Sequence, residues 1–187
     1  SPQNRGKCDI KATDEGIDIS RSLLRQGYIE EKELIRFPGV PGKRIKGLHP
    51  VIECTQNIPC NPCQDACKFG CIKVGGKITR LPEVDMEAIC AGCGKCVVSC
   101  SGQAIFLIDE DYEEAYGTVT MAYEFLPYPV PGMKGTAYGR DGKAVCEAEV
   151  VSCRVNQSMD HTALLTIKVP VDMVMKARFF RAEEETK

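Results

Sequence analysis

Two tight runs of cysteine contain the residues of this sequence that are best suited to chemistry. CNPCQDACKFGC, from Cys60 to Cys71, has the spacing C-x2-C-x3-C-x3-C, and CAGCGKCVVSC, from Cys90 to Cys100, has the spacing C-x2-C-x2-C-x3-C. Cysteines two or three residues apart are poorly placed to pair as disulfides, but their thiolates converge readily on a metal centre. The chain has twelve cysteines and two histidines, so thiolate is the main candidate ligand.

The two runs are copies of an internal repeat. An offset of 33 residues separates three pairs of cysteines: Cys60 and Cys93, Cys63 and Cys96, Cys67 and Cys100. Each copy leads into an apolar, strand-like stretch, IKV or IFLI. In this alignment Cys71 falls opposite Ala104, and the partner of Cys90 would fall at Asn57, three residues after Cys54. We therefore interpret the first run as C-x5-C-x2-C-x3-C, beginning at Cys54, with Cys71 as a spare thiol.

Other ligand sets remain open at this point. Taken at face value, the first run would use Cys60, Cys63, Cys67 and Cys71, and Cys54 would be free. Structural zinc sites use C-x2-C pairs that are well separated in sequence, so two tight runs fit [4Fe–4S] clusters better. The spacing does not decide whether the first cluster is [4Fe–4S] or [3Fe–4S].

From Cys54 to Ile105 the sequence resembles the bacterial-type 2[4Fe–4S] ferredoxins, in which the fourth cysteine of each run binds the other cluster. The resemblance implies two [4Fe–4S] clusters with crosswise ligands: cluster I on Cys54, Cys60, Cys63 and Cys100, and cluster II on Cys90, Cys93, Cys96 and Cys67. Lys68 and Ser101 stand where that family has proline. Each leaves an additional backbone N–H near a cluster, and hydrogen bonds to sulfur raise the reduction potential.

The predicted fold class is α+β, with three parts. Residues 1–50 are expected to form an N-terminal arm with short helices at 18–27, capped by Asp18 or Ser20, and at 30–36. Residues 51–110 are expected to form a dicluster ferredoxin-like core. Residues 111–187 alternate in hydrophobicity around the turn RDGK and predict a small β-barrel or sandwich that serves for docking.

The resemblance extends beyond the cysteines. IECTQNIPCNPCQDAC, LPEVDMEAICAGCGKC, AYEFLPYP and the β-rich tail together resemble the ferredoxin-like subunits of multi-subunit, FAD-dependent amino-acid dehydrogenases of anaerobic prokaryotes. That family implies flavoprotein partners, with FAD or FMN on the partner subunits, that oxidise proline, hydroxyproline, sarcosine or opines. The chain itself would be a non-catalytic electron-transfer subunit. A free-standing low-potential ferredoxin, or a subunit of a different redox complex, is the alternative.

Composition and the absence of other motifs argue against several further classes of function. A net charge of -2 gives no electrostatic case for nucleic acid, and so argues against a non-redox module that binds it. The apolar runs are far shorter than the ~20 residues of a membrane helix, so no membrane insertion is expected. No catalytic triad, phosphate loop or dinucleotide fingerprint is visible, and no catalytic residue is predicted. Free and metal-bound thiols favour the cytoplasm.

Three cysteines lie outside the cluster motifs. Cys8 stands alone near the start of the sequence, and Cys146 and Cys153 lie seven residues apart in one predicted strand. Because side chains alternate along a strand, an odd separation predicts that these two thiols lie on opposite faces. We expect all three to be ordinary core or surface thiols.

Overall fold

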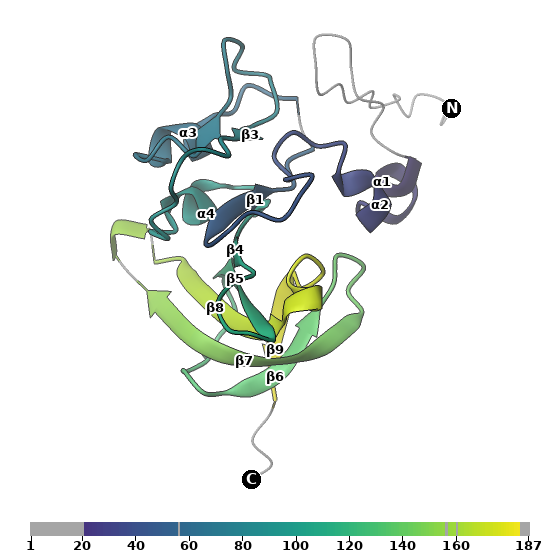
Figure 1. Ribbon diagram of the computed structural model, residues 1–187, viewed down its shortest axis with the longest axis vertical. Helices are drawn as coiled ribbons and strands as arrows, with labels where there is room; N and C mark the ends of the chain where they lie inside the picture. The colour runs from purple at the N-terminus through teal and green to yellow at the C-terminus, as the bar shows by residue number, and fades with distance from the viewer. Residues whose placement is uncertain (1–20, 56, 156, 160, 184–187) are drawn as a thin grey trace, which may run out of the picture.

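The computed structural model describes residues 21–55, 57–155, 157–159 and 161–183 (Figure 1). Its described part contains a seven-stranded sheet in the order β1-β4-β5-β8-β7-β6-β9, in which every neighbouring pair is antiparallel. The strands of this sheet are β1 (His49–Ile52), β4 (Ile105–Asp109), β5 (Tyr116–Tyr123), β6 (Lys134–Tyr138), β7 (Ala144–Val155), β8 (Ala163–Pro170) and β9 (Phe179–Ala182). A separate pair joins β2 (Ile72–Lys73) to β3 (Glu83–Val84).

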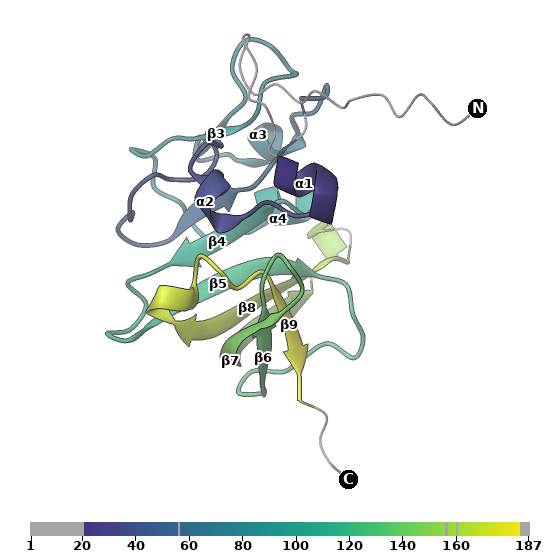
Figure 2. The ribbon, with the colours of Figure 1, turned by 90° about the vertical axis from the view of Figure 1, so that its right-hand side faces the viewer.

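The described helices are short. They are α1 (Arg21–Gln26), α2 (Glu31–Leu34), α3 (Pro62–Ala66) and α4 (Lys95–Ser99), with 3-10 turns η1 (Gln157–Met159) and η2 (Val171–Met173). The views in Figures 1 and 2 place α3 and α4 in a layer at one side of the sheet, away from β6, β7 and β9. The cysteine-rich segment therefore forms one layer, and the strands of the second half of the chain extend beneath it.

The predicted α+β fold, a ferredoxin-like core followed by a separate barrel or sandwich, is wrong. The described structure is mostly β, and the cysteine-rich segment contributes β1 and β4 to the same sheet as the later strands. Strand β4 decides this architecture because it pairs with β1 along one edge and with β5 along the other. Cysteine spacing specifies where ligands lie in loops and short helices, but it does not specify which strands become neighbours. The boundaries at residues 50 and 110 stay a prediction.

Alternation along β4 separates two hydrophobic cores. Ile105 and Leu107 pack with Cys63 and Cys96 in the cysteine layer, whereas Phe106 and Ile108 face the main core. Successive side chains of a strand point to opposite faces, so one buried strand serves both cores. The same rule explains why the apolar stretch IFLI shows no polar alternation, since all four of its residues are buried.

The N-terminal segment packs against the main core. Leu34, Phe37 and Val40 are buried there, and the Ile52 backbone N–H donates to the Gly39 carbonyl oxygen at 2.8 Å. The two predicted short helices are present as α1 and α2, and α1 is followed directly by Gly27, whose φ is 80°. The predicted capping residues Asp18 and Ser20 lie outside the described residues.

The second half of the chain confirms the predicted hairpin. Strands β6 and β7 flank the turn RDGK, where the Gly139 N–H donates to the Lys143 carbonyl at 2.9 Å. A register shift between Val150 and Ser152 interrupts the alternation along β7. Cys146 and Cys153 both pack against the main core as a result, so the prediction that they lie on opposite faces is wrong. Cys8 lies outside the described residues.

Candidate functional site: two groups of cysteines

The internal repeat is preserved in three dimensions. Helix α4 lies 33 residues after α3 at both of its ends, and β4 begins 33 residues after β2. Each helix is followed by a cysteine with similar backbone angles: Cys67 has φ -87° and ψ 89°, and Cys100 has φ -85° and ψ 103°. Three residues further on, Gly70 and Gln103 both have positive φ. The two copies therefore present their last cysteines from the same local structure.

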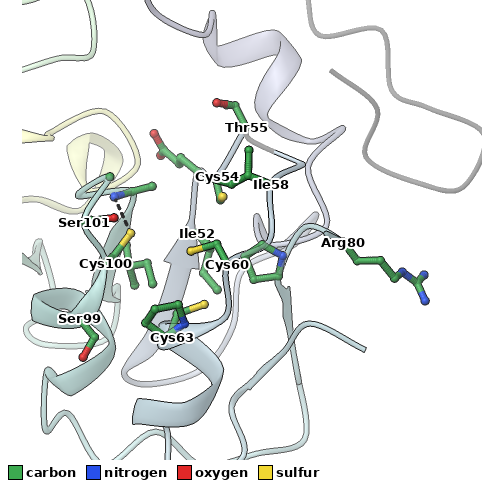
Figure 3. Close-up of a pocket in the computed structure, with 16 residues that line it drawn as sticks. Ile52, Cys54, Thr55, Ile58, Cys60, Cys63, Arg80, Ser99, Cys100 and Ser101 are labelled. Carbon is green, nitrogen blue, oxygen red and sulfur yellow. Dashed lines mark hydrogen bonds between the residues drawn. The ribbon is translucent and has the colours of Figure 1, made fainter. Parts of the chain in front are cut away.

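Four cysteines surround one cavity of about 170 Å³, which we name the first cysteine site. They are Cys54, Cys60, Cys63 and Cys100, the four predicted ligands of cluster I. Figure 3 shows their sulfurs directed toward a shared space, while Arg80 at the rim points away from it. Strand β1 leads to Cys54, helix α3 contains Cys63, and Cys100 follows α4, so both copies of the repeat contribute. That these four cysteines bind one cluster remains a prediction.

The remaining predicted ligands form a second group, the second cysteine site. Cys67, Cys90 and Cys93 each lie close enough to Cys96 to affect its ionisation. By the same criterion Cys63 interacts with Cys54, Cys60 and Cys100. The eight cysteines thus separate into two groups of four, and each group combines one cysteine of one copy with three of the other.

Cys71 lies beside the second cysteine site. Its side chain is buried and lies close enough to Cys67 and Cys90 for both to affect its ionisation. It does not line the cavity of the first site, whereas Cys54 does. The alternative set of Cys60, Cys63, Cys67 and Cys71 would therefore draw its members from two different groups. This placement favours the interpretation in which the first run begins at Cys54.

Burial disfavours the ionised form of three of the eight thiols, Cys63, Cys90 and Cys96. Burial raises the pKa of Cys63 to about 11 and that of Cys96 to about 12, and neighbouring cysteines add to both shifts. Burial also raises the pKa of Cys90. Each thiol must lose its proton to bind iron, so metal binding releases protons and contributes to folding. The backbone N–H of Ala104 donates to the Cys100 sulfur at 3.4 Å, an interaction of the kind that stabilises a metal-bound thiolate (Figure 3).

Behind the first cysteine site lies a buried ionic network that sequence reasoning missed. Glu53 lines the cavity next to Cys54 and accepts hydrogen bonds from Arg140 Nε at 2.7 Å and from Arg178 Nε at 2.8 Å. Burial alone would raise the pKa of Glu53, but the hydrogen bonds and charges of the two arginines outweigh it and hold that pKa below its ordinary value. The sequence does contain one indication of this carboxylate, because Glu53 directly precedes the predicted ligand Cys54. Nothing local in the sequence marks Arg178.

The residues present fit iron–sulfur clusters by the chemistry of their donors. Each site offers four thiols, and the first site surrounds a space that apolar side chains such as Ile52 and Ile105 help to close. Among the described residues no group of three or more His, Cys, Asp and Glu side chains could hold a single metal ion. In a cluster each thiolate binds a different iron atom. The four sulfurs therefore surround a space and do not need to converge on a single metal ion.

No family model matches the chain, and no solved structure resembles it significantly. Within the described residues, no helix has both the length and the apolar character needed to cross a bilayer.

Proposed function

We propose that this protein is the iron–sulfur electron-transfer subunit of a multi-subunit, flavin-dependent dehydrogenase that oxidises a small amine or amino acid. Its partners would be flavoprotein subunits with FAD or FMN, and its location the cytoplasm of an anaerobic prokaryote. The chain would bind two [4Fe–4S] clusters, on the first cysteine site (Cys54, Cys60, Cys63, Cys100) and the second (Cys67, Cys90, Cys93, Cys96). When bound, such clusters accept and release single electrons.

The separation of eight cysteines into two groups of four is the observation that supports this proposal most directly. Four of them line one cavity, and three of the other four, Cys67, Cys90 and Cys93, interact with the fourth, Cys96. Each group contains one cysteine from the other copy of the repeat, which agrees with the crosswise pattern of two-cluster ferredoxins. Helices α3 and α4 pack against each other, so the two groups lie on adjacent elements and electrons would have a short path between them.

The chain's own residues would provide access and insulation. Cys63 and Cys96 are buried, whereas Cys60 is exposed and the neighbouring Ile58 and Ile78 are half exposed. The Cys60 backbone N–H donates to the Ile78 carbonyl at 3.3 Å, which joins these residues into one rim. This rim is the edge at which a redox partner can approach the first cysteine site most closely.

The flavoprotein complex is favoured over a free-standing ferredoxin by the size of the structure beyond the cysteines. The chain from the start of β5 to the end of β9, together with the packed segment before β1, accounts for most of the described residues, and neither part contains a predicted ligand. We expect part of this additional surface to contact partner subunits. The resemblance of the sequence to amino-acid dehydrogenase subunits supports the same assignment.

Size-exclusion chromatography of the native protein, purified without oxygen, tests the proposal. Iron, sulfide and flavin are measured in the same fractions. We expect about eight iron atoms and eight sulfides per chain, in a peak larger than the chain alone that also contains flavin. Amine- or amino-acid-dependent reduction of a dye by that peak would then identify the substrate class.

The other outcomes separate the alternatives. Eight iron atoms per chain at the size of a monomer, without flavin, would favour the free-standing ferredoxin. A flavin-containing peak without amine or amino-acid oxidation would favour a different redox complex. Four or fewer iron atoms per chain in freshly purified protein would contradict the two-cluster assignment.

A further inference from the structure

The ionic network behind the first cysteine site contains more positive than negative charge. Two guanidinium groups, Arg140 and Arg178, share the single carboxylate of Glu53. The exposed fractions of these side chains are 11%, 5% and 9%. Glu31 also attracts Arg178, but it is exposed and its charge is solvated. The buried group therefore has one positive charge in excess.

Arg178 is the less satisfied of the two arginines. Its Nη1 donates to the Val174 carbonyl at 2.9 Å, and its guanidinium lies over the Phe106 ring at 4.7 Å from the centroid. Its Nη2 is buried and has no hydrogen-bond partner among the described residues. Burial lowers the pKa of Arg178 to about 10, so the group stays charged at neutral pH. A buried, incompletely paired cation is costly unless negative charge nearby offsets it.

The charge lies directly behind the cavity of the first cysteine site. Glu53 forms part of the cavity wall, and its carboxylate is hydrogen-bonded to both arginines, neither of which lines the cavity. Four thiolates around that cavity would supply negative charge, and one-electron reduction of the centre adds another. Positive charge in a poorly solvated surrounding stabilises the reduced state and so raises the reduction potential.

We infer that Arg178, acting through Glu53 together with Arg140, is a positioning residue that raises the reduction potential of the centre on the first cysteine site. This inference rests on the proposed function, because it assumes that the site binds an iron–sulfur cluster. The network also ties the segment before Cys54 to Arg140 in the β6–β7 turn and to Arg178 before β9. The second half of the chain would thus set the electronic properties of a centre bound by the first half.

Three variants test the inference: Arg178→Met, Arg178→Lys and Arg154→Met. The first removes the buried charge, and the second keeps a positive charge beside Glu53. Arg154 is an exposed cation that donates to the Gly92 carbonyl at 3.3 Å near the second cysteine site, so it is the control for charge screened by solvent. Iron is assayed in each variant, and both midpoint potentials are measured by dithionite titration followed by electron paramagnetic resonance.

In Arg178→Met we expect one of the two midpoint potentials to fall. At a fixed applied potential the ratio of reduced to oxidised centre should drop at least tenfold, which corresponds to about 59 mV for one electron. The other centre should change less. Arg178→Lys and Arg154→Met should both stay within about threefold of the wild-type ratio, or about 28 mV by the same conversion.

Two results would overturn the inference. One is an unchanged pair of potentials in Arg178→Met with iron content retained. The other is an equal fall in Arg178→Met and Arg178→Lys, because a purely structural role would not distinguish the charged variant from the neutral one. Absence of iron–sulfur signals in the wild-type protein would instead refute the proposed function, so the two failures are distinguishable. If Arg178→Met loses its iron, Arg140→Gln provides a second neutral variant with the same expected fall and the same contradicting results.

Discussion

At the scale of single residues, Cys54 and Cys71 decide how the first run is interpreted. Both have a sulfur near other cysteines, but they belong to different groups. Cys54 lines the cavity with three other predicted ligands, whereas Cys71 lies beside Cys67 and Cys90 of the second site and interacts with them electrostatically. The alignment of the repeat predicted this division from sequence, because Cys71 falls opposite Ala104, which cannot be a ligand.

Replacing each of these two cysteines by alanine should therefore give different iron contents. Cys54→Ala removes a ligand of the first cysteine site, so we expect about seven iron atoms per chain or fewer, compared with about eight in the wild type. Cys71→Ala should retain about eight. Iron and sulfide assays on anaerobic protein measure both. The opposite result, with iron lost in Cys71→Ala and kept in Cys54→Ala, would support the set of Cys60, Cys63, Cys67 and Cys71.

At the scale of elements, the start of α4 makes a close contact with strand β8. Gly94 precedes α4 with φ 76°, and a Cβ placed there would lie 2.2 Å from Cδ1 of Leu164 in β8. Only glycine combines this left-handed conformation with so close an approach. The position of Cys96 and Cys100 relative to the sheet therefore depends on one residue without a side chain.

Gly94→Ala should be more destabilising than an alanine substitution that introduces backbone strain alone. Gly132 is the matched control, because it has φ 85° but open space around its Cβ position. Strain at a positive φ costs roughly 1–3 kcal/mol in both variants, and the contact with Leu164 adds to this only in Gly94→Ala. Anaerobic urea unfolding and iron content measure the difference. Equal midpoints and full iron content in both variants would refute a tight contact between α4 and β8.

At the scale of the whole molecule, the seven-stranded sheet joins the cysteine layer to the second half of the chain. Strand β4 pairs with β1 and β5, and its alternate side chains face the two cores. The Glu53 network adds an ionic connection between the same two halves. Neither half can be separated without exposing the edge and one face of a buried strand, so they are expected to unfold together.

Two optical signals can follow the halves separately. The chain has no tryptophan and six tyrosines, of which all but Tyr28 lie between residues 112 and 138. Tyrosine fluorescence therefore reports on the second half, and visible absorbance of bound clusters reports on the cysteine layer. We expect both signals to change in one coincident urea transition. Loss of the absorbance well before the tyrosine change would contradict a single cooperative unit and support separate domains.

The sequence alone determined the local features of the candidate site. Ligand spacing, the 33-residue repeat and the β6–β7 turn depend on residues close together in the chain, whose chemistry and backbone preferences act locally. The tertiary structure decided which strands pair, because the apolar stretch IFLI is compatible with any neighbours that bury both of its faces. It also decided that Arg140 and Arg178 meet Glu53, which lies 87 and 125 residues away. Contacts at such separations depend on how the whole chain folds, and no local pattern encodes them.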